Sequence, residues 1–211
     1  MIPVVHVITN DEIIARDDFI DVACDIMGTL GARGALHLRA AHTAGARLQE
    51  LGEGLAAAQA ITGAWLVIND RVDVALVVRA RGAQLTSRSL TVDDARHAAP
   101  ALAIGASVHS LEDGRTAVES GADWMVAGHV FVTPSHPEEE GRGLAFVRSL
   151  SAASAVPVIA IGGVRPSHWP ELQEAGAAGV AVIRGVWDAP NAERAANDYL
   201  SAYDDAFPRS T

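Results

Sequence analysis

The sequence predicts an α/β protein, a single-domain (β/α)₈ barrel of the TIM-barrel type. Eight short apolar runs recur along the 211 residues, and segments with helical periodicity lie between them. Most runs are nearly continuous in valine, isoleucine, leucine and alanine, as is typical of parallel strands buried on both faces. Eight similar units favour a closed barrel near the short end of its size range. A doubly wound open sheet is the alternative, disfavoured because no GxGxxG motif follows the first run.

The expected strands, in chain order, are Val4–Thr9, Gly34–Arg39, Trp65–Asp70, Ala83–Thr86, Ala103–His109, Trp124–Phe131, Pro157–Gly163 and Gly179–Gly185. The expected helices are Phe19–Leu30, Leu48–Ile61, one that begins after the capping residue Thr91, Leu111–Ser120, Leu144–Ser154, Glu171–Ala175 and Ala192–Ala206. Gly121 and Gly176 are expected in the left-handed position that ends a helix. No linker or low-complexity tract divides residues 1–211, so we expect one domain.

Composition narrows the function classes. The chain is 49% hydrophobic and 20% charged, which is ordinary for a soluble globular protein. Its net charge of −10 argues against binding to nucleic acid or an anionic membrane. The single cysteine, Cys24, the absence of a signal-like start and the lack of a long apolar run together predict a cytoplasmic protein. An anionic substrate would then have to be attracted by local dipoles and a few arginines.

Polar residues follow the expected strands, where active sites of this barrel class lie. We expect substrate contacts from Arg39, Asn69, Gln84, Ser107, His109 and Thr133. His37 could line the same mouth, whereas His6 lies earlier in its strand and is expected to pack. Asp70 is expected to cap the following helix. No second carboxylate stands near it, so we expect no metal site. The polar stretch 133–143, which includes His136, is expected to form a mobile lid.

Two glycine-containing turns predict a phosphate site. Gly162 and Gly163 follow the seventh expected strand, and Ile183 and Arg184 lie at the end of the eighth. Glycines let backbone N–H groups approach a phosphate, and Arg184 could add a charge-assisted hydrogen bond. Glycines that merely turn the chain out of strands are the alternative, but the placement on strands seven and eight favours phosphate.

His129 is the candidate acid/base residue. It ends the apolar run 124–127 and begins the polar loop, and an imidazole exchanges protons near neutral pH. A packed core histidine is the alternative. One acid/base group beside one phosphate site suggests a proton-shifting enzyme that acts on a small phosphate ester.

At these positions the chain resembles the thiamine phosphate synthase/TenI superfamily over nearly its full length. The matching segments are Leu38-Arg39, Ile68–Arg71, Gly105–Glu112, Gly128–Phe131, Glu140–Gly143, Ile159–Gly163 and Gly179–Val182. The resemblance implies the same barrel fold. The superfamily has two main branches, which catalyse different reactions.

The synthase branch joins a pyrimidine pyrophosphate to a thiazole phosphate with Mg²⁺. Where it has two lysines, this chain has Ala41 and His136. Where it has an acidic metal ligand, this chain has Ser89, and proline stands in the synthases where this chain has His129. Losing these cations should impair departure of pyrophosphate.

The TenI branch carries the Gly-His-Val-Phe motif, and its catalytic histidine corresponds to His129. The resemblance implies a thiazole tautomerase that aromatises a carboxythiazole phosphate without metal, redox cofactor or covalent intermediate. Arg184 departs from the usual serine of the family and puts the substrate's identity in question. Synthase activity, a non-catalytic barrel that binds a thiazole or thiamine phosphate, and another isomerase or lyase on a related phosphate remain alternatives. Apolar positions on the outer helices suggest a dimer.

Overall fold

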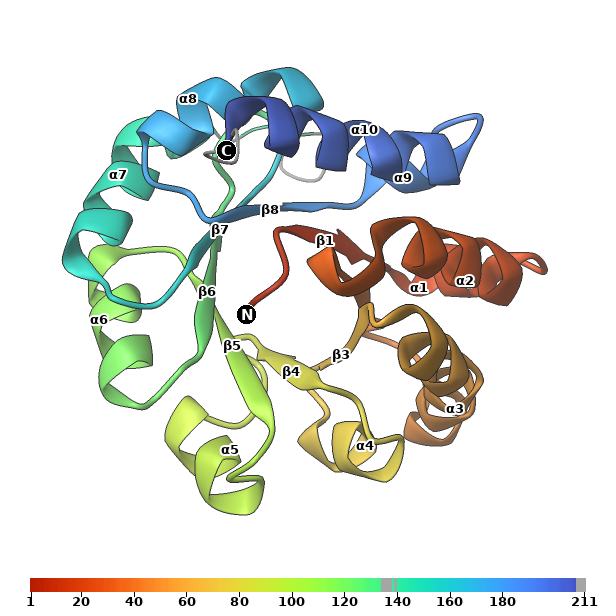
Figure 1. Ribbon diagram of the computed structural model, residues 1–211. Helices are drawn as coiled ribbons and strands as arrows, with labels where there is room; N and C mark the ends of the chain where they lie inside the picture. Colours follow the sequence, from red (N-terminus) through yellow and green to blue (C-terminus); the bar gives the residue numbers. More distant parts are fainter. Residues whose placement is uncertain (134–137, 139, 208–211) are drawn as a thin grey trace.

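The computed structural model describes residues 1–133, 138 and 140–207, and its sheet is a closed barrel of eight parallel strands (Figure 1). Each strand pairs with its neighbours in sequence, and the last strand closes on the first. The strands are β1 (Val5–Ile8), β2 (Gly34–Leu38), β3 (Trp65–Asn69), β4 (Gly82–Leu85), β5 (Ala103–Val108), β6 (Trp124–Gly128), β7 (Val158–Ile161) and β8 (Gly179–Val182). The predicted (β/α)₈ barrel is confirmed.

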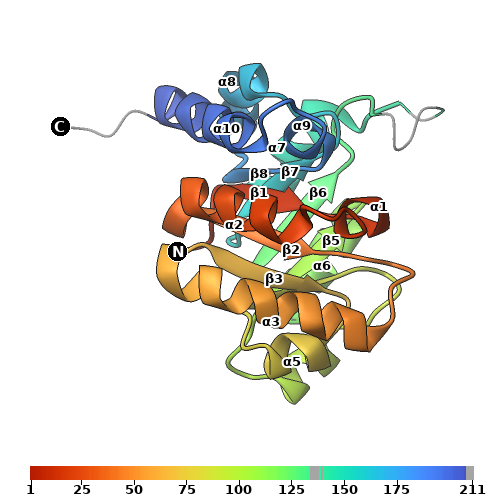
Figure 2. The ribbon, with the colours of Figure 1, turned by 90° about the vertical axis from the view of Figure 1, so that its right-hand side faces the viewer.

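Helices surround the strands on the outside of the barrel, as Figures 1 and 2 show. They are α1 (Asp11–Ile14), α2 (Phe19–Leu30), α3 (Gly45–Thr62), α4 (Val72–Val77), α5 (Val92–Ala98), α6 (Leu111–Glu119), α7 (Gly143–Ala153), α8 (Trp169–Glu174), α9 (Arg184–Trp187) and α10 (Ala192–Ala206), with 3₁₀ turns η1 (Gly31–Arg33) and η2 (Pro166–His168). The seven expected helices are present. The Thr91 side chain caps α5 by accepting from Asp94 N at 3.1 Å.

The eighth strand is shorter than its apolar pattern suggests. The expected strand Gly179–Gly185 ends at Val182, because Ile183 leaves the extended conformation with φ −117° and ψ −86°. Helix α9 then begins at Arg184. Gly121 and Gly176 adopt the predicted left-handed conformation, with φ of 87° and 85°.

Two apolar layers stabilise the barrel. The outer layer fills the space between strands and helices. Inside the barrel, Trp124 is fully buried among Ile8, Val67 and Ile159. The indole leaves no room for a side chain at Gly105, where a Cβ would overlap Trp124 and Gln84. Burial of one large ring therefore dictates a glycine on the neighbouring strand.

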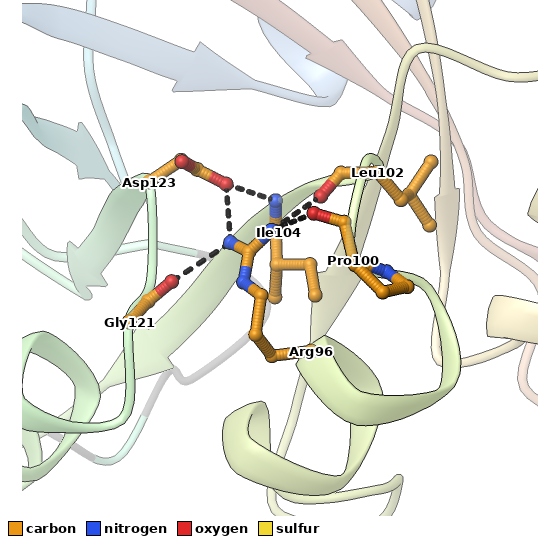
Figure 3. A network of polar contacts seen from close by, with 6 residues as sticks. All are labelled: Arg96, Pro100, Leu102, Ile104, Gly121 and Asp123. Atoms are coloured by element: carbon orange, nitrogen blue, oxygen red, sulfur yellow. Dashed lines mark hydrogen bonds and ion pairs between the residues drawn. The ribbon is translucent and has the colours of Figure 1, made fainter.

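A polar network ties α5 to the beginnings of β5 and β6 (Figure 3). The Arg96 guanidinium donates to the carbonyl oxygens of Leu102 and Gly121, both at 2.8 Å, and to Asp123 Oδ2 at 2.7 Å. The same carboxylate oxygen accepts from Ile104 N at 2.7 Å. These contacts join two strands and a helix at the end of the barrel where the strands begin, away from the predicted site.

Within the described ranges, no helix is both long and apolar enough to cross a membrane.

Candidate active site

A cavity of about 590 Å³ lies at the carboxyl ends of the strands. All eleven residues predicted for the site line it: Arg39, Asn69, Gln84, Ser107, His109, His129, Thr133, Gly162, Gly163, Ile183 and Arg184. The barrel thus brings together residues that are far apart in the sequence. Their individual roles remain predictions.

His129 lies directly beside the Gly162–Gly163 turn. Beyond the assigned ends of β6 and β7 the two chains stay paired, since Val130 N donates to Ile161 O at 2.8 Å and Phe131 N to Gly162 O at 3.0 Å. A Cβ on Gly162 would overlap the Cβ of His129. The predicted acid/base residue and the predicted phosphate turn therefore share one end of the pocket.

Both glycines of this turn need their conformational freedom. Gly162 has φ 98° and Gly163 has φ 66°, in the region that side chains rarely adopt. A Cβ at Gly163 would also overlap Val132 O. Because the carbonyls of Ile161 and Gly162 are held by the β6 side, the turn is fixed in position.

The Gly128 carbonyl determines the proton position on His109. It accepts from Arg142 Nε at 3.0 Å and lies 3.1 Å from His109 Nδ1. A carbonyl cannot donate, so His109 Nδ1 carries the proton. In its neutral form His109 therefore has its lone pair on Nε2 and can accept a proton there.

Gln84 and Ser107 form one buried polar unit. Trp124 Nε1 donates to Gln84 Oε1 at 2.8 Å, and Gln84 Nε2 donates to Ser107 Oγ at 3.1 Å. Only 1% of Gln84 is exposed. The hydrogen bonds hold both side chains at the floor of the pocket.

The expectation that His37 lines the mouth is wrong. His37 is fully buried one layer below Arg39, and the cavity lining among the described residues does not include it. It contacts His6 Nδ1 at 2.8 Å, and His6, buried as expected, contacts Pro3 O at 2.9 Å. Burial lowers the pKa of His6 to about 4, although the hydrogen bond to Pro3 opposes the shift. Burial and the neighbouring His6 also hold the pKa of His37 well below its usual value.

Asp70 does not cap the following helix as expected. It adopts φ 62°, and its carboxylate accepts from Thr86 N at 2.9 Å and Thr86 Oγ1 at 2.7 Å. The cap position of α4 is Arg71, which makes no side-chain capping bond. Asp70 instead joins the ends of β3 and β4.

The described residues hold no group of three or more His, Cys, Asp or Glu side chains placed to bind a metal ion.

Sequence reasoning missed two arginines of the pocket. Arg88 and Arg165 line it together with Arg39 and Arg184, and the described lining residues include no Asp or Glu. Only their positions in the sequence could have indicated them: Arg88 follows the fourth strand, and Arg165 comes two residues after the glycine pair. Four guanidinium groups create a positive region in a chain of net charge −10.

The predicted lid 133–143 falls mostly outside the described residues. Residues 134–137, including His136, and residue 139 are not described.

Fold and pocket together define an α/β-barrel protein with a cavity at the carboxyl ends of its strands. A family model described as thiamine monophosphate synthase matches residues 5–186. The chain belongs to this family, the thiamine phosphate synthase/TenI superfamily.

Individual relatives agree with this assignment. A thiamine-phosphate synthase of Pyrococcus furiosus is 34% identical over 168 residues, covering 80% of this chain and 81% of that protein. The thiamine biosynthesis bifunctional protein ThiM/ThiE of Symbiobacterium thermophilum is 45% identical over 140 residues, which are 65% of this chain but only 29% of the relative. The structure of a thiamine phosphate pyrophosphorylase from Pyrococcus furiosus superposes with a TM-score of 0.84 at 31% identity, covering 96% of both chains.

These relatives are named as synthases or pyrophosphorylases. The comparisons therefore support the superfamily predicted from the motifs, but they do not support the TenI branch in particular. On this point the names of the relatives favour synthase activity, an alternative in the sequence analysis, over tautomerase activity.

Proposed function

We propose that this protein is an enzyme of thiamine biosynthesis that binds a thiazole phosphate in the barrel mouth and isomerises it by proton transfer. The reaction is that of a thiazole tautomerase: a proton leaves ring carbon C2 and another is added to the exocyclic alkene carbon. The observation that carries the proposal is the position of His129 beside the Gly162–Gly163 turn, within one pocket.

The histidines of the pocket supply the required proton chemistry. An imidazole both accepts and donates a proton near neutral pH, which contributes typically about 10²–10⁴-fold to the rate. His129 is the proposed base and acid. His109, whose Nδ1 is occupied by the Gly128 carbonyl, offers its Nε2 on the same pocket wall.

The arginines and the glycine turn support the binding of an anionic substrate. Arg165 and Arg184 line the pocket next to the two predicted phosphate turns. Guanidinium groups bind phosphate through charge-assisted hydrogen bonds, and the glycine N–H groups are the backbone donors we expect to face the phosphate. Anchoring the phosphate would hold the thiazole ring against His129.

The second candidate is thiamine phosphate synthase activity, which the names of the relatives favour. The residues present do not fit its Mg²⁺ site. Ser89 stands in place of the acidic ligand and donates to Thr86 O at 3.0 Å. Asp70 is the remaining carboxylate, and its Oδ1 atom accepts two hydrogen bonds from Thr86. The chain also contains no lysine, so a pyrophosphate could be neutralised only by arginines.

Two assays on the purified protein separate the candidates. Ultraviolet absorbance follows aromatisation of the carboxythiazole phosphate tautomer, and product analysis follows condensation of the aminopyrimidine pyrophosphate with thiazole phosphate in the presence of Mg²⁺. We expect turnover in the first assay and none in the second. Condensation without isomerisation would replace the proposal by the synthase, and binding of thiazole phosphate without either reaction would leave a non-catalytic barrel.

A further inference from the structure

A buried chain of hydrogen bonds runs through the barrel interior to the pocket floor. It links Pro3 O to His6 Nε2 at 2.9 Å, His6 Nδ1 to His37 Nε2 at 2.8 Å, and His37 Nδ1 to the side chain of Asn69 at 3.3 Å. Both histidines and Asn69 are buried, and Asn69 also lines the pocket. The proposed reaction uses neither histidine.

Pro3 O, the acceptor at the start of this series of hydrogen bonds, determines which atom donates in the first two bonds. Pro3 O can only accept, so His6 Nε2 carries a proton. In a neutral His6 ring the Nδ1 atom then has the lone pair, and His37 Nε2 must donate to it. A neutral His37 is left with its lone pair on Nδ1.

Neutral rings fit their surroundings. Trp124 lies 6.3 Å from His6 between ring centroids, and apolar side chains such as Ala35 and Val67 also line the interior. Burial lowers the pKa of both histidines, which favours the uncharged forms at neutral pH.

The lone pair on His37 Nδ1 fixes the orientation of the Asn69 amide. The atom 3.3 Å away occupies the Oδ1 position of Asn69. Two acceptors cannot bond to each other, and the oxygen and nitrogen of an amide exchange places by a 180° turn about the last side-chain torsion. The network therefore assigns Nδ2 to the His37 side and Oδ1 to the pocket side.

We propose that the His6–His37 pair positions the Asn69 carboxamide with its oxygen toward the pocket, so that Asn69 selects a hydrogen-bond donor on the ligand. Hydroxyl, amino and ring N–H groups satisfy this oxygen, whereas an anionic oxygen is disfavoured there. His6 and His37 are positioning residues, and Asn69 is the specificity determinant. The proposal rests on the pocket being the ligand site, as in the proposed function, but not on which reaction occurs.

Asn69 ends β3, between Arg39, which follows β2, and Arg88, which follows β4, whereas Arg165, Arg184 and the glycine turn lie on the β7–β8 side. Arginines therefore occur on both sides of the pocket. The assigned carbonyl oxygen of Asn69 adds a site for a neutral donor between Arg39 and Arg88.

Nuclear magnetic resonance on the ligand-free wild-type protein tests the proton positions directly. Long-range ¹H–¹⁵N correlations should show His6 and His37 neutral at pH 7 with the proton on Nε2. Nuclear Overhauser contacts should join the Asn69 amide protons to the His37 Hε1 proton. A proton on His37 Nδ1, a cationic ring, or absence of these contacts overturns the proposal. Because no turnover is measured, failure here is distinct from failure of the proposed reaction.

A binding experiment tests the consequence for selectivity. In His37→Leu the Asn69 amide loses its fixed partner and can turn its NH₂ group to the pocket. Calorimetry with inorganic pyrophosphate should then show binding roughly 10–100-fold tighter than in the wild type, the value of one hydrogen bond to a charged group. His97→Leu, at an exposed position on α5, is the matched control and should bind as the wild type does.

Equal pyrophosphate affinity in a folded His37→Leu protein contradicts the proposal. Because that variant leaves His6 Nδ1 unpaired, the double variant His6→Leu/His37→Leu removes both rings and should show the same gain. If neither variant folds, the proton positions in the wild type decide.

Discussion

His129 owes its position to its own main chain and to a glycine opposite. Its carbonyl accepts from Arg142 N at 2.9 Å, and the next residue is tied to Ile161 O. Gly162 approaches so closely that only hydrogen fits between the two segments. The imidazole is thus directed by a paired backbone rather than by a flexible loop, which is the arrangement that proton transfer to a fixed carbon atom requires.

Replacing His129 with Gln should abolish most of the isomerisation. Glutamine keeps polarity and approximate size but cannot exchange protons near neutral pH, so we expect kcat to fall by about 10²–10⁴-fold. Binding of thiazole phosphate should persist, measured by calorimetry on the same preparation. His97→Gln, at an exposed site, should retain wild-type turnover. Full activity in His129→Gln would refute the assignment.

Replacing Gly162 with Ala tests the close approach to His129. The added Cβ overlaps His129, and φ 98° is unfavourable for alanine, so we expect a loss of about 1–3 kcal/mol in unfolding free energy together with reduced turnover. Denaturant unfolding and the absorbance assay measure the two effects. Gly143→Ala is the matched control, because Gly143 also has positive φ but no atom within 4 Å of its Cβ position. Similar losses in both variants would mean that backbone strain, not contact with His129, sets the effect.

Single-residue predictions were accurate where strand ends alone decide position. All eleven residues predicted for the site line the mouth, because the carboxyl ends of parallel strands meet there. His37 shows the limit: it points into the barrel like Arg39, but whether a residue reaches the mouth or a deeper layer depends on register between strands. Arg88 and Arg165 lie beyond strand ends, where loop conformation decides and periodicity carries no information.

At the level of elements, the long helices and all strands followed from hydrophobic periodicity, whereas α1, α4 and α9 did not. These helices contain four to six residues, fewer than two turns, so their sequences show no repeating apolar face. Their effect on the site is nevertheless direct. Helix α9 begins at Arg184 and presents it to the pocket, where a longer strand would have placed it differently.

Removing Arg96 should destabilise the junction of α5 with β5 and β6 without altering the pocket. In Arg96→Met the carbonyls of Leu102 and Gly121 lose their donor, and we expect about 1–3 kcal/mol less unfolding free energy by urea denaturation. Arg115→Met is the matched control, because Arg115 pairs with Glu112 on an exposed helix surface and should cost little. Equal effects of the two substitutions would contradict this role of Arg96.

For the whole molecule, the buried histidine pair predicts a loss of stability on mild acidification. The unfolded chain binds protons at His6 and His37 near pH 6.5, whereas burial lowers the pKa of His6 in the folded state to about 4 and that of His37 well below 6.5. Unfolding free energy should therefore fall as pH drops below about 6.5, by roughly 1.4 kcal/mol per pH unit for each histidine. Denaturant unfolding at pH 7, 6 and 5 measures the slope.

Two carboxylates affect the unfolding free energy at lower pH than the histidines do. Burial raises the pKa of Asp11 and Asp113, but hydrogen bonds from neighbouring backbone and hydroxyl groups outweigh it and lower the pKa below 3.8. The contribution of these two carboxylates to stability is present above pH 3.8 and is lost only in stronger acid.

The outcome that would contradict the neutral histidine pair is an unfolding free energy that stays constant between pH 7 and pH 5.

Trp124 connects the barrel interior to the pocket through its hydrogen bond to Gln84. Indole fluorescence responds to the polarity around the ring and to the partner of its N–H group. A ligand that draws the Gln84 amide toward itself changes that partner, and with it the wavelength or yield of the emission. If a ligand contacts Gln84 as predicted, the Trp124 share of the emission from the four tryptophans reports occupancy of the pocket without any attached dye.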